Sequence, residues 1–124
     1  MNGLTFDTGA LLALERRRQG IATVFRVAAE RDIPITVPAA VVAEWWRGRT
    51  DVREDILASV DVEPLEASLA KLAGEAQAAV AGATAIDAIV MASAARRGDV
   101  VYTSDVADLV RLQTFFPNTR VRGV

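Results

Sequence analysis

The run Leu4-Thr5-Phe6-Asp7-Thr8-Gly9 constrains the fold more than any other stretch of this chain. Three residues that suit a β-strand lead directly into a carboxylate, and an apolar helical pattern begins after Gly9. This pattern predicts a strand that passes into a helix, with Asp7 at the carboxyl end of the strand. In open parallel α/β sheets, ligands bind in the crevice beyond those ends. Asp7 is therefore expected either to cap the helix or to begin a functional site.

The rest of the chain alternates between strand and helix patterns. Further strands are expected at 33–37, 60–63 and 100–103, with a last one near Val121. Helices are expected at about 10–18, 21–31, 38–47, 51–57, 65–81, 84–97 and 105–112. Gly20 and Gly48 are expected to end helical patterns, and Pro38 to occupy the first turn of a helix. The alternation predicts an α/β fold, with a mainly parallel sheet covered by helices on both faces, and the length of 124 residues predicts one domain over 1–124.

The composition excludes several kinds of chemistry. The chain has no Cys and no His, which rules out disulfides, thiolate nucleophiles, histidine-ligated zinc and Ser-His-Asp catalysis. Catalysis would have to use carboxylates, hydroxyls, arginines or the single lysine, Lys71. The net charge of −2 gives no overall attraction to nucleic acid, so such a substrate would need a local basic patch or metal ions. No apolar run is long enough to span a bilayer and no basic leader is visible, so a cytoplasmic location without a membrane anchor is expected.

Four of the 16 acidic residues occupy unusual positions. Asp7 and Asp105 each follow a predicted strand. Glu44 interrupts an apolar helical stripe, and Asp87 lies in the first turn of a strongly apolar helix. Taken singly, each has an ordinary explanation, because Asp7 and Asp105 suit helix caps and Asp87 suits the helix dipole. Glu44 has a possible i,i+3 partner in Arg47.

Taken together, the four acids point to a cation site. Two of them end strands of one sheet, so their carboxylates are expected at the same edge. Crowded carboxylates repel one another unless a cation compensates them, and oxygen ligands without His or Cys favour Mg²⁺ or Mn²⁺. Such a site suits phosphodiester hydrolysis, because the metal lowers the pKa of bound water and neutralises charge on phosphorus. Thr103 is a candidate to orient water or a phosphate oxygen, and its ordinary role would be to continue the strand into the turn.

The segments TFDTGALLAL, AAVVAEWWRG, TAIDAIVMASA and VYTSDVADL resemble the four acidic motifs of the PIN domain. They contain Asp7, Glu44, Asp87 and Asp105, and the resemblance covers essentially the whole chain. The E-x-x-R-G form that begins at Glu44 is most similar to VapC-type toxins of bacterial toxin–antitoxin pairs. The resemblance implies a Mg²⁺-dependent ribonuclease, with Mn²⁺ as a substitute, in which the four acids hold the metal and Thr103 is an accessory polar group.

The same resemblance implies further residues and partners. Asp108 fits the acid of the TSDxxD variant and is a candidate further or outer ligand. Arg47 is the first candidate for an RNA or antitoxin contact, and the weaker candidates for RNA contact, equally explained as solvated surface charges, are Arg49, Arg16 and Arg17. A VapB-like antitoxin is expected to lie over the toxin, in a homodimer or in a heterotetramer or hetero-octamer with the antitoxin. Trp45 and Trp46 are neighbours on one helix and cannot easily both face the core, so one of them is expected at an interface.

Two alternatives remain open. Other α/β phosphoryl-transfer folds fit poorly, because Gly9 stands where a haloacid-dehalogenase phosphatase has its second Asp. The lysine of a receiver domain is also missing after the late strand, since Lys71 lies in an Ala-rich helix. A catalytically inactive PIN-like protein-binding module would keep the acids for structure or for binding a regulator. Metal binding separates this module from the active nuclease.

Overall fold

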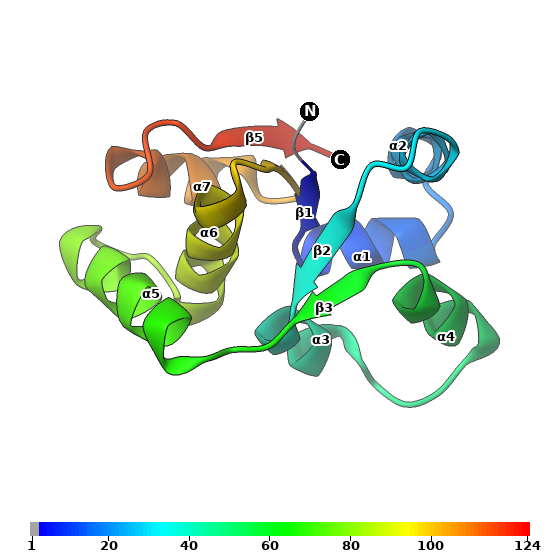
Figure 1. The fold of residues 1–124 in the computed structure, drawn as a ribbon, viewed down its shortest axis with the longest axis horizontal. Coiled ribbons are helices and arrows are strands. Elements are labelled where there is room, and N and C mark those ends of the chain that lie inside the picture. The colour runs from blue at the N-terminus through cyan, green and yellow to red at the C-terminus, as the bar shows by residue number, and fades with distance from the viewer. Residues whose placement is uncertain (1–2) are drawn as a thin grey trace.

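A five-stranded sheet forms the centre of the computed structural model, which describes residues 3–124. The strands lie in the order β3-β2-β1-β4-β5, and every neighbouring pair is parallel. They are β1 (Leu4–Phe6), β2 (Ile35–Pro38), β3 (Asp61–Glu63), β4 (Val100–Thr103) and β5 (Arg120–Gly123). Helices cover both faces of this sheet (Figure 1), which confirms the predicted three-layer α/β fold.

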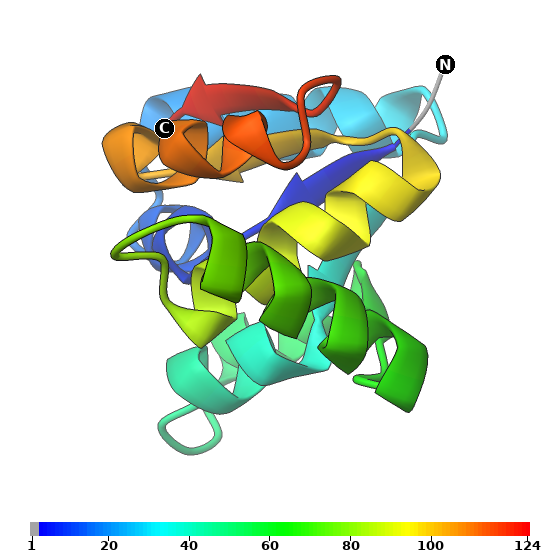
Figure 2. The same ribbon diagram turned by 90° about the vertical axis from the view of Figure 1, so that its left-hand side faces the viewer.

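The helices divide between the two faces (Figure 1). One side carries α1 (Thr8–Glu15), α2 (Gln19–Glu30) and α4 (Asp51–Ala58), and the other carries α5 (Ala67–Ala79), α6 (Ala85–Arg97) and α7 (Val106–Arg111), with a 3₁₀ turn at Leu112–Thr114. Figure 2 shows α5 and α6 packed side by side. The short α3 (Ala39–Trp45) follows β2 directly and contacts both α1 and α6, so it closes the end of the molecule at which the strands finish.

Local signals explain most helix ends, and some differ from the sequence-based expectations. Asp7 caps α1, since its carboxylate accepts a hydrogen bond from the Ala10 N–H at 2.9 Å. Thr50 caps α4, since its hydroxyl oxygen accepts a hydrogen bond from the Arg53 N–H at 3.1 Å. Gly20 lies inside the first turn of α2 instead of ending a helical pattern, because its N–H needs no helical partner there.

The two signals around α3 were also misplaced. Pro38 is the last residue of β2 and stands at the N-cap position, not in the first turn. The helix itself ends at Trp45, before Gly48, which has a φ of 108° in the loop that follows. The loop between α3 and α4 is therefore longer than the periodicity predicts.

The sheet topology places one pair of strand ends at its centre. From β1 the chain builds β2 and β3 on one side, and it later adds β4 and β5 on the other. The strand order therefore reverses between β1 and β4, and this is where open α/β sheets bind ligands. Phe6 is in register with Tyr102, and the Asp7 N–H donates to the Tyr102 carbonyl oxygen at 3.3 Å. Asp7 and Thr103 consequently leave the two central strands next to each other.

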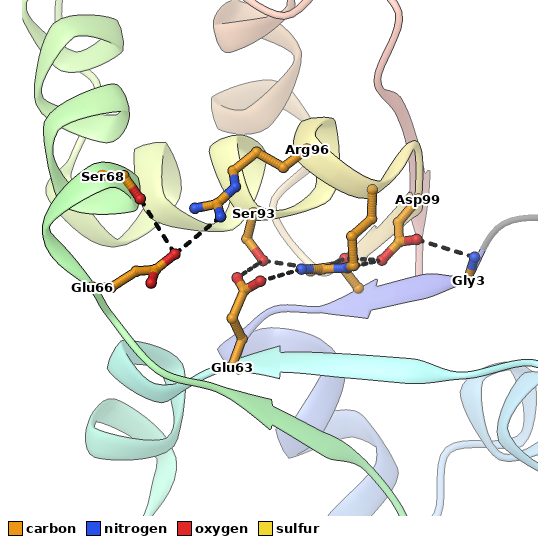
Figure 3. Close-up of polar contacts among 9 residues, drawn as sticks. Gly3, Glu63, Glu66, Ser68, Ser93, Arg96 and Asp99 are labelled. Atoms are coloured by element: carbon orange, nitrogen blue, oxygen red, sulfur yellow. Dashed lines mark hydrogen bonds and ion pairs between the residues drawn. The ribbon is translucent and has the colours of Figure 1, made fainter.

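A buried polar network lies between the sheet and α6 (Figure 3). The Arg97 guanidinium donates to Glu63 at 2.6 Å and to Asp99 at 2.9 Å. It also donates to the hydroxyls of Thr5 and Ser93, both at 2.9 Å. These contacts connect β1, β3, α6 and the start of β4. Because Glu63 and Asp99 both accept from Arg97, the polar groups on the sheet face under α6 have hydrogen-bond partners.

Candidate functional site

Four acidic side chains border one hollow at the central strand ends. They are supplied by four separate elements: the end of β1, α3, the first turn of α6 and the turn after β4. The hollow has a volume of about 130 Å³ and is lined by Asp7, Thr8, Gly9, Glu44, Ile86, Asp87, Ser104 and Asp105. We call it the acidic hollow. The structure thus brings together the four acids selected from the sequence, whereas Thr103 and Asp108 are not part of this lining.

Asp7 is the most enclosed of these acids, with 6% of its surface exposed. Burial raises the pKa of its carboxyl group above the ordinary value, and hydrogen bonds from the Thr103 side chain and the Ala10 N–H oppose the rise. The nearby charges of Asp87 and Asp105 raise it further. The helix cap expected for Asp7 and its place at the site are therefore both present in the same side chain.

Thr103 supports the site from within β4. It is fully buried, and its hydroxyl oxygen accepts a hydrogen bond from the Asp105 N–H at 2.8 Å. Its side chain also hydrogen-bonds Asp7. Thr103 therefore links the acid at the end of β1 to the acid after β4, which is a positioning role and not contact with the space inside the hollow.

Glu44 reaches the hollow from α3 and is held by Thr8. The Thr8 hydroxyl donates to Glu44 Oε1 at 2.5 Å, which connects the first residue of α1 to α3. The expected i,i+3 side-chain pair with Arg47 is absent from the described residues; instead Arg47 Nε donates to the Glu44 carbonyl oxygen at 3.3 Å. The Glu44 carboxylate is exposed and faces the acidic hollow without a basic partner among residues 3–124.

Asp87 occupies the first turn of α6, where Thr84 is the N-cap. The Thr84 hydroxyl oxygen accepts a hydrogen bond from the Asp87 N–H at 3.1 Å. Burial raises the pKa of Asp87, and the hydrogen-bonded Thr84 side chain opposes this rise. The charges of Asp108 and Glu44 raise it further, and the charge of Arg111 opposes them.

Asp105 and Asp108 form an acidic pair at the rim of the acidic hollow. A hydrogen bond between the two side chains is the largest cause that raises the pKa of Asp105, followed by burial. Arg111 counters part of this negative charge, because its guanidinium lies 2.5 Å from Asp108 Oδ1. Asp105 stands at the N-cap position of α7 without a side-chain capping bond, so the capping explanation suggested by the sequence is wrong for this residue.

The donor set fits a hard divalent cation. The four acids offer only carboxylate oxygens. Burial is the largest cause that raises the pKa values of Asp7 and Asp87, and the hydrogen bond with Asp108 is the largest for Asp105. Neighbouring acidic charges raise all three pKa values further. Among residues 3–124, no three acidic side chains converge into a preformed set of metal ligands. A cation in the hollow would offset the mutual repulsion of these carboxylates.

Sequence reasoning missed several residues that shape the hollow. Thr8 was not predicted as part of the site, because its contact with Glu44 depends on how α1 packs on α3. A Cβ atom on Gly9 would lie 1.9 Å from the Ser104 hydroxyl oxygen, so only glycine allows α1 to approach this turn. Arg111 carried a weak signal, since it stands three residues after Asp108 on one helix.

The remaining candidates lie outside the acidic hollow. Arg16, Arg17 and Arg47 are exposed, and Arg49 is paired with Asp51 at 3.2 Å. Trp45 is 1% exposed and belongs to the core, while Trp46 is half-buried and packs against it edge to face. An interface role for Trp46 stays a prediction.

The fold and site define an α/β domain with an acidic centre where its strand order reverses. The family profile of the PIN domain matches residues 4–112, and the chain belongs to this family. A search against curated proteins finds no match. No helix within residues 3–124 has the length and apolar character needed to cross a membrane.

Solved structures with a similar fold include three DNA-bound complexes. The chain resembles DNA-bound VapBC from Salmonella typhimurium with a TM-score of 0.72 and 18% identity, over 99% of this chain and 98% of that chain. It resembles VapBC2 from Rickettsia felis, bound to a DNA fragment from its promoter, with a TM-score of 0.74 and 12% identity, over 98% of both chains. The FitAB complex with a DNA fragment gives a TM-score of 0.64 and 17% identity, over 97% of this chain and 94% of that chain. At these identities the likeness concerns the fold.

Proposed function

We propose that this chain is a ribonuclease that depends on Mg²⁺, with Mn²⁺ as a substitute, and that it acts as the toxin of a toxin–antitoxin pair. The observation that carries the proposal is the acidic hollow of a PIN domain, in which four acids from four elements face one space. Oxygen ligands alone favour these ions over zinc. Asp7, Glu44, Asp87 and Asp105 would hold the ion, with Asp108 as an outer ligand.

The residues of the chain prepare the site in different ways. A bound ion would supply Lewis-acid chemistry that activates water and neutralises charge on the phosphoryl group. Ala10 N–H and Thr103 fix Asp7, and Thr8 fixes Glu44, so two acids approach the hollow in defined positions. The raised pKa of Asp105 indicates that this rim acid holds a proton more tightly than usual while Asp108 hydrogen-bonds it. Ionised carboxylates are needed for cation binding, so a bound cation and this proton compete.

The direct test is cleavage of structured RNA by the purified, partner-free chain in Mg²⁺ and in EDTA. Asp7→Asn is the preferred inactive variant, because asparagine retains the helix cap that alanine would remove. Asp55→Asn is a matched control, since Asp55 is exposed on α4, away from the acidic hollow. Cleavage that needs both Mg²⁺ and Asp7, and that persists in Asp55→Asn, supports the proposal. Absence of cleavage together with absence of metal binding would favour the inactive binding module.

The toxin role is supported by the similarity of the fold to the VapBC and FitAB structures. The E-x-x-R-G form that begins at Glu44, which resembles VapC-type toxins, also supports it. We expect expression of the chain alone to stop bacterial growth, and Asp7→Asn to restore it. Co-expression of a VapB-like antitoxin should also restore growth. Light scattering of the isolated chain and of the complex tests the proposed homodimer and the heterotetramer or hetero-octamer. Growth arrest that persists in Asp7→Asn would separate toxicity from the acidic hollow.

A further inference from the structure

A second hollow adjoins the acidic one along α1. It has a volume of about 440 Å³ and shares Thr8 and Glu44 with the acidic hollow. Its other walls include three basic side chains, Arg16, Arg47 and Arg53. We call it the arginine hollow. Two neighbouring depressions on this surface therefore carry charges of opposite sign.

One of the three arginines is committed to the structure. Arg53 lies 3.0 Å from Glu15 Oε2 and donates to the Gly48 carbonyl oxygen at 2.9 Å. Glu15 also accepts a hydrogen bond from the Trp45 indole N–H at 2.9 Å. Arg53 thus supports the wall formed by α1, α3 and α4, and its charge is already balanced.

The other two arginines are not paired with an acidic side chain in the described structure. Arg16 and Arg47 are exposed, and neither has an acidic partner within the part of the chain that the structure describes. Arg47 uses only its Nε atom, on the Glu44 carbonyl oxygen, so the terminal nitrogens of its guanidinium are free to bind. The chain rises about 12 Å along α1 from Thr8 at the acidic hollow to Arg16, at 1.5 Å per residue. Arg16 consequently lies near the acidic hollow without being part of its lining.

We propose that Arg16 and Arg47 form a subsite that binds a backbone phosphate of the substrate RNA next to the scissile phosphate. The inference rests on the proposed ribonuclease function. RNA must approach four carboxylates on a chain of net charge −2, so attraction has to come from cations placed beside the acids. Guanidinium groups match phosphate oxygens in geometry as well as charge.

The lining of the arginine hollow favours contact with the backbone rather than with bases. Trp45 is the only aromatic side chain in the lining, and with 1% of its surface exposed it offers no face on which a base could stack. Phosphate contacts set the position of a nucleic acid without reading its sequence. The subsite therefore positions RNA for cleavage, and target choice has to come from other surfaces.

Binding of a labelled single-stranded RNA of mixed sequence tests the subsite directly. Fluorescence anisotropy in Mg²⁺, on the Asp7→Asn background, measures affinity without cleavage. We expect Arg16→Gln and Arg47→Gln each to weaken binding about 5- to 30-fold. Each should also reduce the slope of log affinity against log salt by about 0.7. Arg120→Gln is the control, because this exposed arginine begins β5 at the opposite end of the sheet and changes the net charge equally.

The kinetics of the cleaving protein provide the second readout. With Asp7 intact, the two substitutions should raise KM and leave kcat nearly unchanged, and melting curves should match the parent protein because both side chains are exposed. If Arg16→Gln and Arg47→Gln weaken RNA binding no more than Arg120→Gln does, the subsite is refuted. So would variants that bind RNA normally and lose only affinity for the antitoxin, which would assign the arginine hollow to the protein partner. Metal-dependent cleavage with an unchanged KM would refute the subsite alone, whereas no cleavage with intact, Arg16-dependent RNA binding would refute the nuclease alone.

Discussion

Replacing Asp99 by asparagine tests how strongly the polar network under α6 stabilises the fold. The Asp99 side chain is 3% exposed, and its Oδ1 atom accepts a hydrogen bond from the Gly3 N–H at 3.0 Å. Its Oδ2 atom accepts from the Thr5 hydroxyl and from Arg97 Nε, both at 2.9 Å. Figure 3 shows Asp99 at one end of this network and Glu63 at the other. All three partners of Asp99 are donors, so the position requires a group that only accepts.

The cost of Asp99→Asn follows from this arrangement. One carboxylate oxygen becomes an amide NH₂ that faces a donor, which leaves a buried N–H without an acceptor at about 1–3 kcal/mol. The charge-assisted bond to Arg97 also weakens, although Arg97 keeps Glu63 at 2.6 Å and is 28% exposed. Together these effects should lower the free energy of unfolding by about 2–4 kcal/mol. With a urea m-value of about 2 kcal/mol per M, the midpoint should fall by about 1–2 M.

Urea unfolding followed by circular dichroism measures this change. Glu66→Gln is the matched control, because Glu66 pairs with Arg96 at 3.0 Å in the same region but is exposed (Figure 3). The control should leave the midpoint nearly unchanged, since solvent screens the exposed pair. A free energy of unfolding of Asp99→Asn within about 0.5 kcal/mol of the parent value would refute the reasoning. It would mean that the three donors around Asp99 do not require a group that only accepts.

Two further predictions concern the acidic hollow, and a third concerns Arg17, after the end of α1. In metal-free protein near pH 7, Asp87→Asn should stabilise the fold or leave it unchanged, because burial and neighbouring acids raise the pKa of Asp87. An acid whose pKa is raised in the folded state lowers the free energy of unfolding at a pH above that pKa, and has no such effect below the pKa of the unfolded state. A large decrease in the free energy of unfolding of Asp87→Asn, measured in urea, would instead mark Asp87 as a structural hydrogen-bond acceptor. Mg²⁺ at about ten times its dissociation constant should raise the free energy of unfolding of the parent protein by about 1.4 kcal/mol, and that of Asp7→Asn by much less. Equal shifts of the melting temperature in the two proteins would place the ion outside the acidic hollow. Arg17→Gly should raise the free energy of unfolding by about 0.5–1 kcal/mol, because Arg17 has a φ of 56°. Arg17→Ala keeps the Cβ atom and should leave the free energy of unfolding unchanged. Equal increases for the two variants in chemical unfolding would mean that the loss of charge, not the backbone conformation, is responsible.

Much of the architecture was predictable because its signals are local. The strand-to-helix pattern around Asp7 identified β1, the helix that follows and the cap between them. Alternating patterns identified the other strands, including the last one near Val121, and parallel pairing followed from the helices between them. Errors were confined to ends: α3 stops at Trp45, and Gly20 falls within α2. Helix ends depend on capping contacts that a periodic pattern does not contain.

The sequence by itself determined which residue types were available for chemistry. With no His and no Cys, only oxygen ligands and basic side chains remained, and the acids after β1 and β4 were assigned to one edge of the sheet. That assignment required only that parallel strands end on the same side. It did not require knowing how the helices pack.

Tertiary structure alone decided which side chains meet. Packing of α1 against α3 brings Thr8 to Glu44, and the fold of α6 over the sheet joins Arg97 to Glu63, 34 residues away. The same packing separates Arg53, which is paired with Glu15, from Arg16 and Arg47, which have no acidic partner within residues 3–124. Such contacts depend on the relative placement of helices across the sheet. Local periodicity carries no information about that placement, because each helix records in its sequence only that one of its faces is buried.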